Sequence, residues 1–298
     1  MLAGDDFAVA GYLPSYRVDD WTASLDERAD IPVTDLIYFQ ATPRPDGTLP
    51  DDAVSDERLS TLRTTGDRIG CRLSVCIGGW GKSETFRPLV ASPDARRSLI
   101  AEVRRLGFDS VDFDWEYPET AADWAGYVAL VREANAGLSG VVSVAIPPQR
   151  ETPPELFEAA DRIHLMSYDH QFPQATVGKA VDDVDWAIAV GCPPSKLLLG
   201  LPFYGRNADR DAIAYSELSW PELGEATGTD LTPGGRYAFN SRATIASKVR
   251  LARLAGLGGV MVWELGQDHT DGRSLLRALG DAIDRDNSGD GERSASAD

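Results

Sequence analysis

Eight short apolar runs recur along the chain. Most are nearly continuous in hydrophobicity, without the strict alternation of a half-exposed strand. That pattern is typical of strands buried on both faces of a parallel sheet. The runs cover residues 7–13, 35–41, 72–78, 108–115, 141–147, 162–168, 196–204 and 258–265.

Several segments between these runs carry the spacing of amphipathic helices. Residues 94–106 place Leu99, Ile100, Val103 and Leu106 on one face. Strands alternating with helices predict right-handed βαβ units, and eight such units predict a single-domain (β/α)8 TIM barrel of the α/β class. An open doubly wound sheet is the alternative, but no Gly-x-Gly-x-x-Gly motif follows the first run. Further helices are predicted at 122–134, 243–254 and 274–283.

The barrel is expected to span residues 5–285. The longest connection, 205–257, follows the seventh run, and its first half is predicted to be a short insertion on the barrel rim. Residues 286–298 are polar, acidic and poor in apolar side chains, so a disordered tail is predicted there.

The formal net charge of −18 excludes some classes of partner. Nucleic acids and anionic membrane surfaces both need a basic face, so neither is expected to bind. Only four of the 29 basic residues are Lys. Such a surface fits a protein from a halophile, and it equally fits a genome biased toward Arg, Asp and Ala.

Targeting signals are weak in this sequence. The first residues lack the basic and apolar segments of a signal peptide, and no run reaches the length of a membrane-spanning helix. A cytoplasmic monomer is the direct prediction, and secretion with a leader absent from this sequence is the alternative. The odd number of cysteines (Cys71, Cys76 and Cys192) predicts free thiols. No ligand spacing for a metal and no cofactor motif is present, so neither is expected.

The segment 108–118, FDSVDFDWEYP, concentrates acidic residues in a predicted strand. Alternate side chains of a strand share a face, so Asp112, Asp114 and Glu116 are expected to point into the barrel over about 13 Å. Phe113 and Trp115 are expected to face the helices. Glu116 comes last, at the end of the barrel where TIM barrels keep their active sites.

Three carboxylates on one buried face cannot all stay ionised cheaply, because desolvation and like charge favour the protonated form. At least one is expected to be a carboxylic acid ready to donate a proton near neutral pH. Two other interpretations remain: a solvated run of charge, and a site for a divalent cation. The rigid spacing of a strand fits a single ion poorly.

The sequence resembles glycoside hydrolase family 18, the chitinase family. Asp109, Asp112, Asp114 and Glu116 match its D-x-x-D-x-D-x-E motif in full. Four further motifs are similar in the same order: CIGGW at 76–80, MSYD at 166–169, GLPFYGR at 200–206 and GGVMVWEL at 258–265. In the CIGGW motif, Cys76 stands where the family usually has Ser. Asp109, Cys76, Gly78 and Gly79 are expected to support the site.

The resemblance implies a retaining hydrolase that uses substrate-assisted catalysis. Glu116 would protonate the glycosidic oxygen. Asp114 would orient the 2-acetamido group and stabilise its positive charge, and Asp112 would help Asp114 to switch partners. Tyr168 would hydrogen-bond the acetamido group from the opposite side, with Asp169 beside it. A thiol is a weaker donor than a hydroxyl, so Cys76 is expected to shift the pH profile without abolishing activity.

The resemblance also implies contacts to the sugar. Trp263 would form the floor under the sugar, and Trp80 would stack on the leaving-group side. Plain core packing is the alternative for aromatic residues, and a rim salt bridge is the alternative for Arg206. His164, His170 and His269 receive no catalytic role, although His170 could contact substrate. Further candidates for substrate binding are Tyr12, Phe39, Met166 and Arg206.

The expected substrate is therefore chitin or an oligosaccharide of β-1,4-linked N-acetylglucosamine. An endo-β-N-acetylglucosaminidase and a peptidoglycan hydrolase are alternatives within the same chemistry. A lectin-like barrel that binds sugar without cleaving it is a third hypothesis. Such relatives typically lack the last carboxylate of the motif, whereas Glu116 is present.

Overall fold

The computed structural model describes residues 7–27, 31–108, 110–219 and 230–287. Eight parallel strands close into a barrel in the order β1-β10-β7-β6-β5-β4-β3-β2. The predicted (β/α)8 TIM barrel is confirmed. The barrel strands are β1 (Ala8–Pro14), β2 (Asp35–Ala41), β3 (Arg72–Gly78), β4 (Ser110–Asp114), β5 (Val142–Ile146), β6 (Arg162–Leu165), β7 (Leu197–Pro202) and β10 (Gly259–Trp263).

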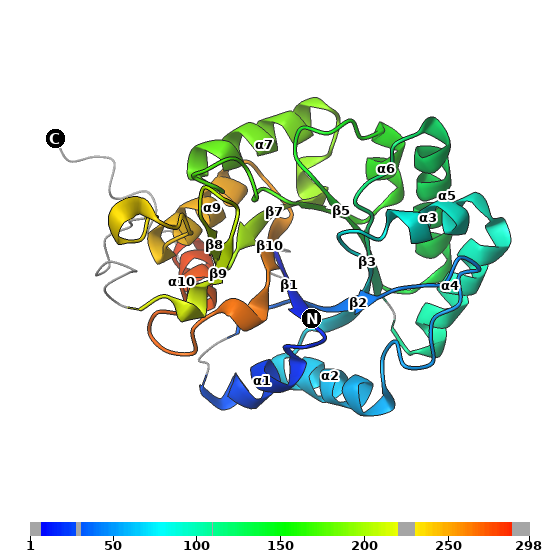
Figure 1. The fold of residues 1–298 in the computed structure, drawn as a ribbon, viewed down its shortest axis with the longest axis horizontal. Coiled ribbons are helices and arrows are strands. Elements are labelled where there is room, and N and C mark those ends of the chain that lie inside the picture. The colour runs from blue at the N-terminus through cyan, green and yellow to red at the C-terminus, as the bar shows by residue number, and fades with distance from the viewer. Residues whose placement is uncertain (1–6, 28–30, 109, 220–229, 288–298) are drawn as a thin grey trace.

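Helices surround the strands as an outer ring (Figure 1). The four predicted helices are present as α4, α5, α9 and α10, and α10 continues two residues beyond the expected barrel boundary of 285. The predicted tail from 288 onward lies outside the described residues. The helices are α1 (Val18–Ala23), α2 (Asp56–Ile69), α3 (Ser83–Ala91), α4 (Pro93–Arg105), α5 (Ala121–Gly137), α6 (Pro154–Ala159), α7 (Val177–Ala189), α9 (Arg242–Leu254) and α10 (Leu275–Asn287).

The long connection after β7 begins as a small antiparallel pair. Strand β8 (Tyr204–Arg206) pairs with β9 (Ala212–Ala214) outside the barrel. Two hydrogen bonds tie the connection to the segment before α10: the Tyr215 hydroxyl donates to the Arg273 carbonyl (3.2 Å), and His269 Nε2 lies 3.1 Å from the Leu218 carbonyl. Its described part is a rim insertion, as predicted; residues 220–229 are not described.

The faces of β4 are divided as the alternation predicts. Phe113 and Trp115 lie in the apolar core between strands and helices, where the Phe86 ring stacks on Trp115 at 5.1 Å. The interior of the barrel has a much smaller apolar cluster, which leaves room for polar groups. That inner cluster consists of Ala8, Ala10, Tyr12, Ile37, Cys76, Leu198 and Met261.

A buried ion-pair network closes the base of the barrel. Asp35 is 2% exposed and begins β2. Its carboxylate accepts hydrogen bonds from Arg72 Nε (2.7 Å) and Arg162 Nη1 (2.7 Å). These arginines begin β3 and β6, so the network joins the starts of three strands. Burial alone would raise the pKa of Asp35, but the Arg72 hydrogen bond and the Arg162 charge outweigh it and lower the pKa.

We expect Asp35→Asn to destabilise the fold by about 3 kcal/mol, because it leaves two cationic side chains at the barrel base without their anion. The value is at the low end for broken buried pairs, since Arg72 is half-exposed and can turn to water. Urea unfolding at neutral pH measures the change. A carboxyl whose folded pKa is lowered stabilises the protein above its ordinary titration range, so the difference from wild type should shrink as the pH falls below 4.

Asp19→Asn is the matched control. Asp19 pairs with Arg58 at 2.6 Å, but its side chain is 79% exposed. An exposed pair contributes little to stability. Equal losses of unfolding free energy in the two variants would show that the Asp35 network stabilises the fold no more than an exposed ion pair does.

Candidate active site

The carboxylates of β4 lie inside the barrel at its carboxyl end. Asp112 is 0% exposed and Asp114 is 6% exposed, and Glu116 follows directly after the strand. Strand β3 approaches β4 closely here: the Gly79 amide donates to the Asp114 carbonyl (2.7 Å). A Cβ atom on Gly78 would lie 2.2 Å from that carbonyl oxygen, and Gly78 has a φ of +119°. Gly78 is thus required by backbone approach, whereas Gly79 has a φ of +99° and a Cβ there would meet the side chains of Gln40 and Phe39. Asp109 lies outside the described residues.

Asp112 is held by three side chains from three other strands. The Tyr12 hydroxyl donates to Oδ2 (2.7 Å), and the Ser143 hydroxyl donates to Oδ1 (2.6 Å). His164 Nδ1 lies 3.2 Å from Oδ1. Burial by itself would raise the pKa of Asp112, but the His164 charge and these hydrogen bonds outweigh it and lower the pKa. Asp112 is therefore the carboxylate that stays ionised.

Asp114 has the opposite environment. Burial, followed by the charges of Glu116 and Asp112, raises its pKa well above the usual range. Its Oδ1 atom is buried and has no hydrogen-bond partner among the described residues. The opposite pKa shifts of Asp112 and Asp114 favour a proton on Asp114 over one on Asp112, and Asp114 has one oxygen left for an incoming group.

Both the backbone carbonyl and the side-chain carboxyl group of Glu116 accept hydrogen bonds. The Ser83 hydroxyl donates to the Glu116 carbonyl (2.8 Å) and accepts from Trp115 Nε1 (3.1 Å). The Tyr117 hydroxyl donates to Glu116 Oε2 (2.8 Å). Burial raises the pKa of Glu116, the Tyr117 hydrogen bond opposes this, and the Asp169 charge adds to it. The net effect is a raised pKa for Glu116, and its role as a proton donor stays a prediction.

The MSYD segment after β6 faces these carboxylates across the barrel mouth. Asp169 accepts the Tyr204 hydroxyl (2.6 Å) and a two-point ion pair from Arg206, whose Nη2 lies 2.7 Å from Oδ2. Of the two interpretations of Arg206, the structure thus contains the rim salt bridge, and a sugar contact stays a prediction. Among the described residues, the Tyr168 hydroxyl has one weak hydrogen bond, to Met261 Sδ (3.8 Å). It can therefore turn to a ligand.

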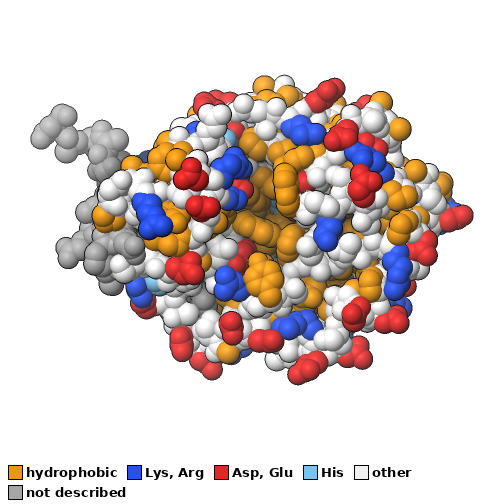
Figure 2. Space-filling model, viewed as in Figure 1, with side chains coloured by type: hydrophobic (Ala, Val, Ile, Leu, Met, Phe, Trp, Pro, Cys, Tyr) orange, Lys and Arg blue, Asp and Glu red, His pale blue; other side chains and the backbone are white. Residues whose placement is uncertain are grey.

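Hydrophobic side chains surround the hollow at the centre of the face shown in Figure 2. Trp263 is half-buried, and its ring meets Phe39 edge-on at 4.6 Å and Tyr12 at 5.5 Å. Met166 packs on the same inner cluster. Trp80, in contrast, is 76% exposed on the β3–α3 loop. Trp80 is therefore not a core residue, which was the competing interpretation.

The three histidines differ in their surroundings. His164 sits within the carboxylate site, in contact with Asp112 and Tyr12, and the expectation that it has no catalytic role stays a prediction. His170 Nε2 lies 2.9 Å from Asp183 Oδ2, which also accepts the Ser167 hydroxyl (2.7 Å). Asp183 on α7 thus contacts the residues on either side of Tyr168 and Asp169, which helps to fix the MSYD segment in place. His269 binds the rim insertion.

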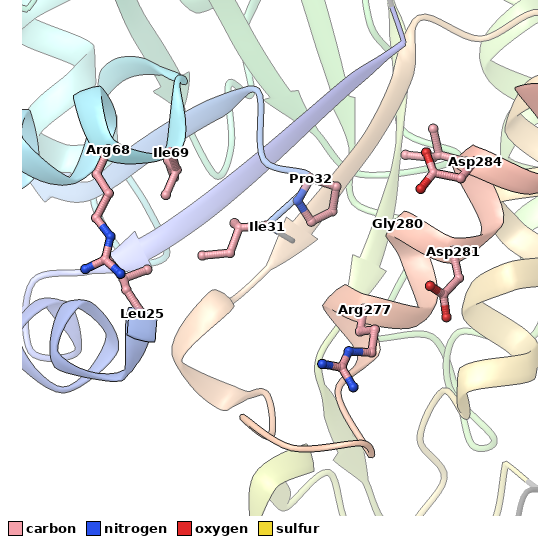
Figure 3. A pocket seen from close by; sticks show the side chains of 10 residues that line it. Leu25, Ile31, Pro32, Arg68, Ile69, Arg277, Gly280, Asp281 and Asp284 are labelled. Atoms are coloured by element: carbon pink, nitrogen blue, oxygen red, sulfur yellow. The ribbon is translucent and has the colours of Figure 1, made fainter. Parts of the chain in front are cut away.

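A second hollow lies on the side of the barrel, with a volume of about 680 Å³. Leu25 and Arg68 stand on one side of it, and Arg277, Asp281 and Asp284 of α10 stand on the other (Figure 3). Its lining includes no residue from the carboxyl ends of the strands and no group of buried carboxylates. Within the described ranges no three His, Cys, Asp or Glu side chains are grouped to hold a metal ion, and no described helix is long and apolar enough to cross a membrane.

Comparison with known proteins gives one consistent family. The sequence profile of glycosyl hydrolases family 18 matches residues 9–268. Chitinase 1 of Aphanocladium album is 26% identical over 92% of this chain and 84% of that protein. The chain spans only 14% and 60% of two longer probable chitinases of Drosophila melanogaster.

Solved structures share the fold. A chitinase from Bacteroides thetaiotaomicron superposes with a TM-score of 0.80 at 24% identity, covering 93% of this chain and 96% of that one. A family 18 chitinase variant from Cycas revoluta, solved in complex with (GlcNAc)4, superposes with a TM-score of 0.76 at 22% identity, covering 93% and 99%.

The family profile covers the barrel from β1 to just beyond β10. The carboxylates, the paired glycines and the MSYD segment all lie within that match, at the carboxyl ends of the strands. The chain belongs to glycosyl hydrolases family 18, and it is a glycoside-cleaving enzyme.

Proposed function

We propose that this enzyme cleaves β-1,4-linked N-acetylglucosamine in chitin or chitooligosaccharides, with retention of anomeric configuration and with the substrate's own acetamido group as nucleophile. The observation that carries the proposal is the buried Asp114. Its Oδ1 atom has no hydrogen-bond partner among the described residues, and it lies between an ionised carboxylate and the carboxylic acid of Glu116. An acetamido N–H is a donor that this oxygen lacks.

Glu116 starts the reaction by donating its proton to the glycosidic oxygen as the bond to the anomeric carbon breaks. The acetamido carbonyl oxygen attacks that carbon from the opposite face and forms a cyclic oxazolinium ion. Water then attacks the same carbon, gives a proton to Glu116, and reopens the ring. Two inversions at one carbon give net retention, and a neighbouring group inside the substrate replaces an enzyme nucleophile.

Asp114 accepts the acetamido N–H through its free oxygen and offsets the positive charge on the ring. When Glu116 becomes a carboxylate, Asp114 shares its own proton with it through a hydrogen bond, which leaves partial negative charge on Asp114 and leaves Glu116 able to accept the proton of water. Asp112 then remains as the anion of the pair, held by Tyr12 and Ser143. Tyr168 donates its hydroxyl to the acetamido oxygen from the facing strand.

The aromatic side chains bind the sugar faces. Sugar rings present C–H groups that pack on indole. Trp263, fixed by Phe39 and Tyr12, forms the floor beneath the sugar whose bond is cleaved. Trp80, exposed on the rim, stacks on a sugar of the leaving group. The relative from Cycas revoluta that binds (GlcNAc)4 supports a substrate of this class.

The test compares products from chitooligosaccharides, colloidal chitin, chitobiose-core glycans and peptidoglycan. Cleavage of the first two with the β-anomer as the initial product, observed by NMR, is the expected result. Cleavage confined to the glycans or to peptidoglycan would instead favour an endo-β-N-acetylglucosaminidase or a peptidoglycan hydrolase. An oligosaccharide with hydroxyl in place of acetamido should not be cleaved, and its turnover at a comparable rate would refute the substrate-assisted route.

A further inference from the structure

A histidine lies inside the barrel beneath the acid, at a position outside all five family motifs. His164 is in β6 and is 1% exposed. Its Nδ1 atom lies 3.2 Å from Asp112 Oδ1 and 2.9 Å from the Tyr12 hydroxyl oxygen. Strands β1, β4 and β6 thus bring an imidazole, a phenol and a carboxylate into mutual contact.

We propose that His164 is a positioning residue that holds Asp112 as a carboxylate and so leaves the proton of the Asp112–Asp114 pair on Asp114. The inference rests on the proposed function, because it assigns a role within that reaction. In an interior that excludes water, a carboxylate is stabilised by the hydrogen-bond donors and bases around it, and an imidazole in contact with it adds to what neutral hydroxyl donors supply.

The other side chains in contact with Asp112 are not basic. Tyr12 and Ser143 contribute neutral hydroxyl groups. Cys76 is the register partner of Asp112 on β3, and burial raises the pKa of its thiol well above the usual value. A protonated thiol is a weak donor, so the residue that replaces the family's usual Ser contributes little.

The remaining neighbours of His164 are apolar or already paired. Its register partners are Ala145 on β5 and Leu198 on β7. Arg162, two residues before it on β6, binds Asp35 at the barrel base. The other carboxyl groups on this side are Asp114 and Glu116, which repel negative charge on Asp112. At the level of Asp112, His164 is therefore the basic side chain that the described part of the barrel offers.

The contact between His164 and Asp112 affects where negative charge lies during the reaction. When Asp114 shares its proton with Glu116, Asp112 keeps its own negative charge beside the partial charge that develops on Asp114. The lowered pKa of Asp112 and the raised pKa of Asp114 agree with this division. His164 offsets the charge that remains, and it acts through Asp112 without touching the sugar.

The test is the pH profile of His164→Asn on a chitooligosaccharide. We expect kcat to fall roughly 10- to 100-fold, with KM nearly unchanged, since a general acid–base arrangement typically contributes a factor of this order or more. Loss of the imidazole contact raises the pKa of Asp112, so the acid limb of the kcat profile should move to higher pH. A second substitution, Cys76→Ser, should restore part of kcat by supplying a hydroxyl donor to Asp112.

His269→Asn is the matched control, because His269 is also buried but binds the Leu218 carbonyl outside the barrel. Its profile should keep the wild-type acid limb. His164→Gln takes the place of the Asn variant if thermal melting shows that the latter does not fold. An unshifted acid limb in a folded, active His164 variant would overturn the inference, whereas inactivity of the wild type on all N-acetylglucosamine substrates would instead overturn the proposed function.

Discussion

Glu116→Gln is expected to reduce turnover of a natural chitooligosaccharide by about 1000-fold, within the range for loss of a positioned general acid. Gln keeps the volume and the Tyr117 contact but has no proton to give to the glycosidic oxygen. An alkoxide leaving group depends on that proton, whereas a phenolate with a low pKa leaves without much help. The loss should therefore be much smaller on a 4-nitrophenyl chitooligoside than on the natural substrate.

The ratio of these two losses is the decisive measurement, because a misfolded variant would lose both activities equally. Glu119→Gln makes the same chemical change three residues away, on an exposed side chain that pairs with Arg87. That control should retain wild-type turnover on both substrates. Comparable losses of turnover on the natural and activated substrates would show that Glu116 is not the general acid.

If Glu116 is the general acid, the direction in which activity changes with pH follows. Burial, helped by the Asp169 charge, raises the pKa of Glu116 against the opposing hydrogen bond from Tyr117. A general acid must be protonated, so activity should persist above the ordinary titration range of Glu and fall as the pH rises through the raised pKa. Tyr117→Phe removes the opposing hydrogen bond and should move the alkaline limb to still higher pH.

The fold and the acid strand were predictable because each depends on local periodicity. Eight apolar runs with helices between them define the barrel. Alternation along β4 places Asp112 and Asp114 inside, and it places Phe113 and Trp115 among the helices. The glycines at 78 and 79 carry a second local signal, since their motif follows an apolar run.

The partners of Asp112 were not predictable in this way. Ser143 and His164 stand in different strands, and only the barrel register brings them to one carboxylate. A lone histidine carries no periodic signal, so nothing in the sequence separates His164 from His269. The roles of Tyr117 and Ser83 were not predictable either, because their contacts with Glu116 depend on the backbone conformation of loops.

Asp114→Asn is expected to lower kcat on chitooligosaccharides by roughly 100- to 1000-fold, the usual effect of removing one preorganised group that stabilises transition-state charge. Asn has nearly the same shape, and its carbonyl oxygen can still accept the acetamido N–H. It carries no titratable proton for Glu116 and no charge to offset the oxazolinium ion. Binding of the unreacted substrate should therefore change little.

Two measurements separate this role from general damage to the site. Affinity for the uncleaved oligosaccharide should stay within a few-fold of wild type, whereas affinity for a cyclic thiazoline analogue of the charged intermediate should fall in parallel with kcat, as expected for groups that favour the transition state. Asp185→Asn on the exposed face of α7 should leave both unchanged. A variant that loses substrate affinity and keeps kcat would show that Asp114 only binds the sugar, and the route through the acetamido group would lose its main support.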